Sequence, residues 1–167
     1  RDRLRSRGLG DVYKRQDNFL ARIIHLLKQQ QVDASMLYTS DHGEDIFDDG
    51  RHLFLHASPV PSYYQLHVPL LLWTSDSYRE EYPGIEKAAS MNRQKNISSS
   101  ISFFQTMMEL AGIETPYRND SLSVTSPLYT EKSRVYLNDH NEPHSLDDIG
   151  MRKEDFEMLK KRGIDAQ

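Results

Sequence analysis

The stretch MLYTSDHGE, residues 36–44, decides the fold of this 167-residue chain. Its apolar first half predicts a buried strand over residues 34–39. An adjacent carboxylate and imidazole, Asp41 and His42, follow that strand and precede a glycine. Because ligands of α/β proteins gather at the carboxyl ends of strands, the stretch predicts a metal site at this strand's end.

The residues on either side of this strand predict a helix before it and a second buried strand after it. Asp17 can cap a helix that fades at residues 29–31. Its apolar positions fall on one face and are Phe19, Leu20, Ile23, Ile24 and Leu27. Residues 68–73 form the longest apolar run and predict the second strand. A helix followed by buried strands indicates an α/β fold.

Between the two strands lies a long loop at residues 43–67, and after the second strand comes an irregular polar segment at residues 74–97. The sequence then predicts a helix over residues 98–111, a short strand over 134–137 and a last helix over 152–162. A loop this long is usually functional or disordered. Gly112 is expected to end the helix at residues 98–111. The predicted apolar stripe of that helix is Ile101, Phe104, Met108 and Ala111. Phe156 and Leu159 are expected to face inward from the last helix.

The composition is that of a soluble globular protein, with 37% hydrophobic and 28% charged residues. The apolar run at residues 68–73 is far shorter than the roughly 18–20 residues that a membrane helix needs. No signal peptide is visible. The absence of cysteine excludes disulfides and thiolate metal sites.

Residues 1–16 carry six of the 21 basic residues and two of the 25 acidic ones. They show no clear periodicity and look like translated sequencing-adapter read-through, so we expect them to be non-native and the chain, which starts at Arg1, to be a fragment. Residues 17–167 then hold 15 basic and 23 acidic residues. Such an acidic body argues against a nucleic-acid partner.

Asp41 and His42 are suited to Zn²⁺, which binds carboxylate oxygen and imidazole nitrogen at about 2.0–2.2 Å. Neighbouring side chains on an extended strand point to opposite sides, so both can reach one metal only if the chain turns. Gly43 permits that turn. Glu44 could accept a hydrogen bond that orients His42. A lone Asp-His-Gly would indicate a solvated loop, but the buried strand before it and the histidines after it favour a metal site.

The histidines downstream offer further candidates. His56 could ligate a second metal when neutral, or hold a phosphate oxygen when charged, and His52 competes for this role. His140 belongs to a polar cluster at residues 138–144 that could approach the metal. His25 and His67 are expected to be structural. The acidic run Glu44, Asp45, Asp48 and Asp49 lacks the EF-hand spacing, so we expect a solvated acidic loop.

Three segments together, residues 38–44, 55–59 and 65–73, resemble the phosphoethanolamine transferases of the alkaline phosphatase and sulfatase superfamily. The family pattern runs Ser-Asp-His-Gly-Glu, then Leu-His-Gly, then Gln-x-x-Val-Pro ending in Trp. The helices around residues 17–20 and 110–113 are also similar to the family's, so the resemblance covers residues 17–113 well and the remainder loosely. The combination is specific, whereas Asp-His-Gly alone is shared with sulfatases.

The resemblance implies that Asp41 and His42 bind a catalytic zinc, with Ca²⁺ or Mn²⁺ as alternatives, and that His56 is catalytic, near the transferred phosphate or a second zinc. Residues 17–167 would form the C-terminal part of a sulfatase-like sandwich, with a central, mostly parallel sheet flanked by helices. In the family, a threonine nucleophile accepts phosphoethanolamine from a phospholipid and passes it to a lipid A or glycan acceptor. The full-length enzymes are anchored in the bacterial inner membrane with this domain in the periplasm, so we expect the fragment itself to be soluble.

The chain departs from the family pattern in three places. The loop between Asp41 and His56 is two residues longer than expected, and Ala57 replaces a glycine. The threonine nucleophile and the other upstream carboxylate ligand of the metal would precede Asp17, where residues 1–16 offer no counterpart, so we expect this chain to be inactive alone. Two alternatives remain open: a sulfatase or phosphodiesterase of the same superfamily, with Arg51 as the sulfate ligand, and a noncatalytic metal-binding module.

Overall fold

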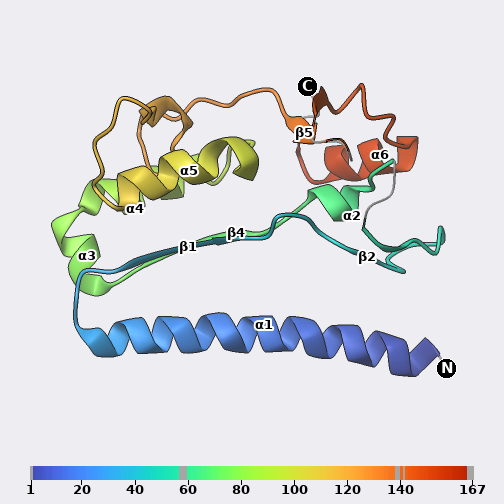
Figure 1. Ribbon diagram of the computed structural model, residues 1–167, viewed down its shortest axis with the longest axis horizontal. Coiled ribbons are helices and arrows are strands. Elements are labelled where there is room, and N and C mark those ends of the chain that lie inside the picture. The colour runs from blue at the N-terminus through green and yellow to red at the C-terminus, as the bar shows by residue number, and fades with distance from the viewer. Residues whose placement is uncertain (1, 57–59, 138–139, 141, 165–167) are drawn as a thin grey trace.

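A computed structural model describes residues 2–56, 60–137, 140 and 142–164, with side chains from residue 14 onward. The helices are α1 (Asp2–Gln30), α2 (Tyr63–Leu66), α3 (Asp76–Glu81), α4 (Pro83–Asn92), α5 (Ser99–Leu110) and α6 (Lys153–Lys161) (Figure 1). The strands are β1 (Ser35–Thr39), β2 (Asp45–Ile46), β3 (Phe54–Leu55), β4 (Leu70–Thr74), β5 (Val135–Leu137) and β6 (Pro143–Ser145). None of the helices in these described ranges combines the length and the apolar character that crossing a membrane requires.

Helix α1 begins at Asp2, so Asp17 lies within the helix and does not cap it. Residues 2–16 include four Arg and two Leu, which favour helix, and extending a helix costs much less than nucleating one. The predicted apolar face is half-buried except for Phe19, which is exposed. The helix ends as predicted near Gln31, whose backbone has a positive φ.

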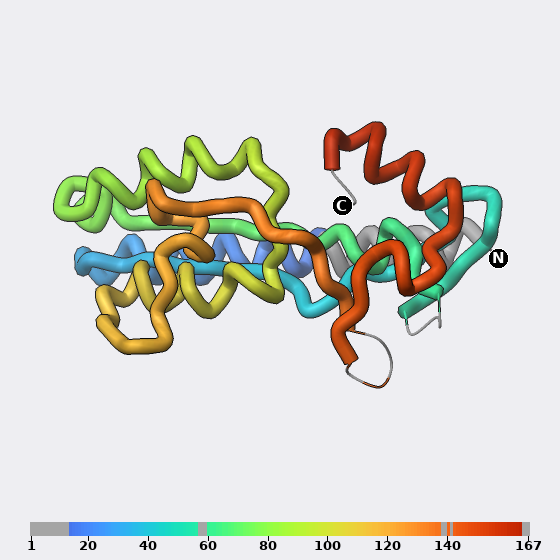
Figure 2. The backbone as a smooth tube through the Cα atoms, turned by 90° about the horizontal axis from the view of Figure 1, so that it is seen from above, coloured from blue at the N-terminus to red at the C-terminus, as the bar shows by residue number. Residues whose placement is uncertain are grey.

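Strands β1 and β4 form an antiparallel pair in which Ser35 lies opposite Thr74 and Thr39 opposite Leu70. Both strands were predicted, and the mixed α/β architecture is confirmed. The direction differs from the mostly parallel sheet that we expected, because each of the sheets in the described part of the chain is a two-stranded antiparallel pair. Helix α1 runs along one face of the β1–β4 pair, and α4 and α5 lie over the other (Figures 1 and 2).

The segment at residues 74–97, predicted to be irregular, contains the two helices α3 and α4. Ser75 caps α3 by accepting a hydrogen bond from the Tyr78 amide, and Pro83 starts α4. The buried residues of α4 are the small Ala88 and the polar Asn92, whose side chain donates to two backbone carbonyls. A search for apolar periodicity therefore could not detect this helix.

Helix α5 begins and ends where predicted, but it buries a different face. Its buried residues are Ser102, Thr106 and Leu110, whereas Phe104 of the predicted stripe is half exposed. The Thr106 hydroxyl accepts a hydrogen bond from the Val124 amide, so this face packs on a polar segment. Gly112 ends the helix with φ +63°, and the Ile113 amide returns to the Met108 carbonyl at 2.9 Å.

A second group of elements packs at the carboxyl end of β1, where α2, α6 and the β2–β3 hairpin meet (Figure 1). Its core is a cluster of Tyr63, Leu146, Met151 and Leu159, with Phe156 half-buried against it. The last helix therefore faces inward as predicted. Ala57 and three members of the 138–144 cluster, Asn138, Asp139 and Asn141, lie outside the described residues.

Candidate metal centre

The chain turns immediately after β1, and this turn carries Asp41 and His42. The Ser40 hydroxyl donates to the His42 carbonyl at 2.6 Å, and the His42 amide donates to Asp41 Oδ1 at 3.1 Å. Asp41 Oδ2 lies 3.7 Å from His42 Nε2. Its own backbone amide, the His42 imidazole and the His42 amide all lower the pKa of Asp41. Asp41 is exposed, and of the two predicted ligands only His42 belongs to the cluster of potential ligands described below.

Gly43 fixes this turn against α2. Its amide donates to the Gln65 carbonyl at 2.8 Å. A Cβ at this position would lie 2.0 Å from the Tyr64 carbonyl oxygen, so only glycine allows the two backbones to approach this closely. The sequence predicted a conformational role for Gly43, and the structure adds this close contact.

Glu44 and His56 face each other across the β2–β3 hairpin. The pairing of Asp45 with Leu55 and of Ile46 with Phe54 makes Glu44 and His56 the next opposed pair. Glu44 Oε1 and His56 Nδ1 are 2.7 Å apart. We expected Glu44 to orient His42, but its hydrogen bond goes to His56, because the hairpin register brings those two together.

His42 and His56 lie with their ring centroids 3.9 Å apart. The ligand atoms of His42, Glu44 and His56 all lie within 4.8 Å of one another, and within the described ranges this is the one cluster of three or more potential ligands. His42 Nδ1 contacts the Gly43 carbonyl, which can only accept, so Nδ1 carries the proton. The carboxylate of Glu44 imposes the same tautomer on neutral His56.

This arrangement fits a divalent metal of the zinc type. With Nδ1 used in these contacts, the neutral form of each imidazole has an unprotonated Nε2, which is the form that binds metal. Glu44 Oε2 is buried without a hydrogen-bond partner, and a buried, unpaired carboxylate oxygen requires a cation or other partner. Two imidazoles and carboxylate oxygens are a donor set that Zn²⁺ prefers.

A cavity of about 530 Å³ opens beside these residues, between α1, the β1–β4 pair and α2. Its lining comprises Gln16, Asp17, Leu20, Tyr38, Ser40, His42, Gly43, Glu44, Ile46, Asp48, Tyr63, Tyr64, His67, Pro69 and Leu71. His42 and Glu44 therefore border a space large enough for a small ligand.

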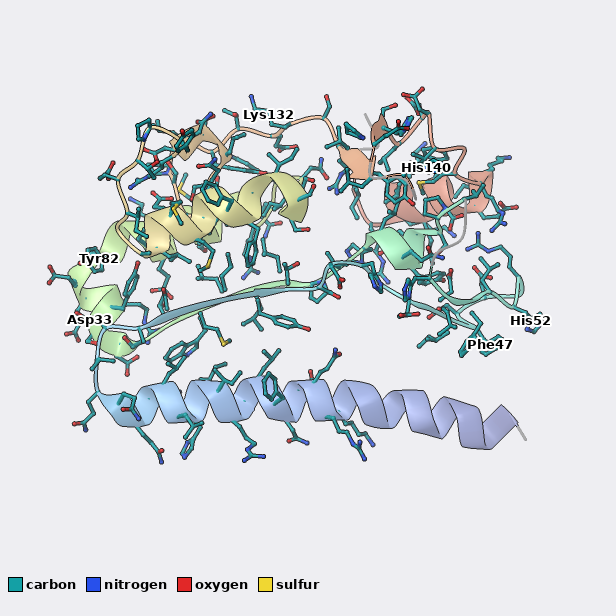
Figure 3. All side chains as sticks on the ribbon, viewed as in Figure 1. Asp33, Phe47, His52, Tyr82, Lys132 and His140 are labelled. Atoms are coloured by element: carbon teal, nitrogen blue, oxygen red, sulfur yellow. The ribbon has the colours of Figure 1, made fainter. Side chains whose placement is uncertain are left out.

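The other candidate histidines lie apart from this cluster. His52 is exposed at the hairpin turn with φ +56°, and its ring faces Phe47 (Figure 3). His140 is exposed and does not belong to the ligand cluster (Figure 3). His67 bonds to the Tyr63 hydroxyl and His25 to Gln29, which agrees with structural roles. Of the two loop histidines, the structure brings His56 and not His52 to His42.

The predicted solvated acidic loop is wrong for two of its members. Asp45 is buried and accepts hydrogen bonds from the Ser62 hydroxyl at 2.7 Å and the Gln65 side-chain amide at 2.5 Å. Asp49 binds the guanidinium of Arg51. Asp45 fixes the hairpin to α2, and Asp49 holds Arg51 within the hairpin's turn. The role of Asp45 could not be read from sequence, because its partners lie 17 and 20 residues further along the chain. The partner of Asp49, in contrast, is only two residues away.

A sequence profile of the Sulfatase family matches residues 10–113, which is more than half of the chain. The chain belongs to this family. Phosphoethanolamine transferase EptA of Salmonella typhimurium is 32% identical to this sulfatase-family chain over 116 residues, covering 66% of the chain and 21% of the relative. Phosphoethanolamine transferase EptC of Escherichia coli is 25% identical over 132 residues, covering 78% of the chain and 22% of the relative. The chain thus spans about a fifth of the length of these enzymes.

Two solved structures share the fold. The C-terminal periplasmic domain of Escherichia coli EptC superposes with a TM-score of 0.63 at 26% identity, covering 71% of this chain and 33% of that one. The same domain in complex with Zn gives a TM-score of 0.68 at 24% identity, covering 83% and 38% respectively. The resemblance to phosphoethanolamine transferases and the α/β class are therefore confirmed, as is similarity to a family of enzymes.

Proposed function

We propose that this chain supplies part of the metal centre of a phosphoethanolamine transferase. In this proposal Asp41 and His42 bind Zn²⁺, and His56 lies beside them as a further ligand or as the group that holds the transferred phosphate. Glu44 fixes the tautomer of His56 and supplies a carboxylate oxygen to the same site. The chemistry that zinc supplies in such a site is polarisation of a phosphoryl oxygen.

The observation that carries this proposal is the hydrogen bonding of the two imidazoles. His42 and His56 each use Nδ1 within the protein, at 3.0 Å to the Gly43 carbonyl and 2.7 Å to Glu44, which leaves both Nε2 atoms available. Groups that bond to the second nitrogen of a ligating histidine are the usual support of catalytic metal sites. A solvated loop would not need this double orientation or the buried, unpaired Glu44 oxygen.

The named relatives support a proposal for the wider reaction. The named enzymes include the Kdo(2)-lipid A phosphoethanolamine 7''-transferase of Escherichia coli, 26% identical over 105 residues, covering 60% of this chain and 18% of the relative. We therefore propose transfer from a phospholipid donor to a lipid A or glycan acceptor through a phospho-threonine intermediate. The nucleophile would come from a segment before residues 17–167. The site would face the periplasm in an enzyme anchored in the bacterial inner membrane.

The sulfatase alternative loses its sulfate ligand. It required a free basic residue after the motif, and Arg51 was the candidate. The Arg51 guanidinium instead spans two carboxylates, bonding to Asp49 and to the buried Asp155. Both carboxylates raise the pKa of Arg51, so its charge is fixed but already neutralised by protein groups. The guanidinium N–H groups of an arginine held in this way are not available to bind a sulfate ester.

Metal analysis and ligand binding test the proposal. The purified chain is expected to retain zinc after dialysis, and Asp41→Ala and His42→Ala are each expected to abolish that retention. The zinc-loaded chain should then bind O-phosphoethanolamine in calorimetry more tightly than inorganic sulfate. Wild-type zinc stoichiometry in both variants would refute the ligand assignment. Tighter binding of inorganic sulfate than of O-phosphoethanolamine would instead favour the sulfatase hypothesis.

A further inference from the structure

The metal-site hairpin is attached to a helix that lies far beyond it in the sequence. Asp155, in the first turn of α6, is fully buried. Its Oδ2 accepts from Arg51 Nη1 at 2.7 Å, and its Oδ1 accepts from Arg51 Nη2 at 3.0 Å. This is a two-point, charge-assisted contact across 104 residues of sequence. Arg51 lies within residues 10–113, which match the family, whereas Asp155 lies outside them.

The same carboxylate also holds α2. Asp155 Oδ1 accepts from the Tyr63 amide at 2.9 Å, at the start of that helix. Helix α2 in turn bonds to Asp45, the first residue of β2, through Ser62 and Gln65. Asp155 therefore joins two supports: it anchors the hairpin's turn through Arg51 and the hairpin's base through α2.

These two supports determine where the metal-site side chains lie. Glu44 directly precedes β2, and His56 directly follows β3. Arg51 lies in the turn between those strands and is itself gripped by Asp49 at 2.9 Å from Nε to Oδ2. A shift of the turn would move both strands and so change the separation between Glu44 and the paired imidazoles.

We infer that Asp155 is a positioning residue of the metal centre, so that helix α6 holds the Glu44–His56 hairpin in its metal-binding arrangement. This inference rests on the proposed function, because it assumes that His42, Glu44 and His56 bind zinc. Asp155 has no direct contact with that site. Its effect passes through the guanidinium of Arg51 and the backbone of α2.

Zinc calorimetry on the full 167-residue chain tests this inference with Asp155→Asn. This variant keeps an acceptor for the Tyr63 amide but removes the charge that holds Arg51. Zinc binding is expected to weaken by about tenfold or more, the lower end of what loss of a supporting group costs a metal site. The visible spectrum of the cobalt-loaded chain should change as well. Glu157→Gln is the charge-matched control, because Glu157 is exposed on the same helix, and it should change neither readout.

A second pair of variants separates positioning from loss of stability. Leu159→Val loosens the packing of α6 without touching the ion pair, so it should lower the melting temperature yet preserve zinc affinity and the cobalt spectrum. Arg51→Lys retains the charge but not the fork, so it should weaken zinc binding as Asp155→Asn does, even if Asp155→Asn fails to fold.

The outcomes are distinguishable. If Asp155→Asn folds and binds zinc with wild-type affinity, the inference is overturned and the proposed function stays intact. If Asp155→Asn does not fold, wild-type zinc affinity in Arg51→Lys overturns the inference in the same way. Equal loss of affinity in Leu159→Val overturns it too, because general destabilisation would then explain the effect. Failure of the wild-type chain to bind zinc overturns the proposed function and the inference together.

Discussion

Replacing Gly43 with alanine is expected to displace the metal-site turn from α2. The new Cβ would lie 2.0 Å from the Tyr64 carbonyl oxygen, whereas Cβ contacts below 3.0 Å essentially do not occur. The two backbones must therefore separate by about 1 Å. The hydrogen bond from the Gly43 amide to the Gln65 carbonyl, now 2.8 Å long, cannot survive that movement.

The cost combines two effects. An amide left without its partner costs about 1–3 kcal/mol, and forced overpacking costs about another 1–3 kcal/mol. The free energy of unfolding should thus fall by about 2–6 kcal/mol, which at a urea m-value of about 2 kcal/mol per M moves the midpoint down by about 1–3 M. His42 and Glu44 flank Gly43, so zinc affinity should fall at least tenfold in the same variant.

Gly50→Ala is the matched control. A Cβ added at Gly50 meets no atom within 4 Å, so the substitution should leave the urea midpoint nearly unchanged and zinc binding intact. A Gly43→Ala chain with the wild-type midpoint and wild-type zinc affinity would show that the turn does not depend on this close approach.

Three further variants test the electrostatic and packing arguments. Arg51 lowers the pKa of Asp49 by hydrogen bonding, so the stability this carboxylate contributes is present above about pH 3.9 and lost as the pH falls through its lower folded value. Wild type should therefore exceed Asp49→Asn in unfolding free energy at pH 6 and approach it near pH 2; a constant difference would refute this. Tyr78→Phe removes a 2.8 Å hydrogen bond to the Leu110 carbonyl and should lower the unfolding free energy measured in urea by about 1 kcal/mol. An unchanged unfolding free energy would contradict this prediction. Asn92→Ala removes two buried hydrogen bonds: the Val124 carbonyl loses its side-chain donor, whereas the Ser126 carbonyl keeps the Tyr129 amide. The variant should cost about 2–4 kcal/mol by the same assay, and a near-neutral result would contradict the packing of Asn92.

Sequence reasoning succeeded where apolar periodicity and local chemistry agree. Strands β1 and β4, the limits of α5 and its stop at Gly112 follow from such signals. The sequence also predicted that Asp41 and His42 lie in a turn directly after a strand, and the structure places them there. That these residues bind a metal stays a prediction. The choice between His52 and His56 could not be made from sequence, because it depends on the hairpin register that sets His56 opposite Glu44.

Several of the failures share one physical cause, which is burial of polar side chains. Helices α4 and α5 bury Asn92, Ser102 and Thr106, so their buried faces are not the continuous apolar stripes that the sequence search detects. The buried carboxylates Asp45 and Asp155 were missed for the same reason. Each is stabilised by partners that lie 17 to 104 residues away in the sequence, and no local sequence pattern predicts such pairs.

The pairing of His42 with His56 is the central claim of this account, and zinc calorimetry on His56→Ala and His52→Ala measures it most directly. His52 and His56 lie on the same hairpin and are both exposed, but only His56 is bonded to Glu44 and packed on His42. We predict that zinc affinity falls at least tenfold in His56→Ala and stays at the wild-type value in His52→Ala. Loss of zinc in His52→Ala with wild-type affinity in His56→Ala would contradict the account.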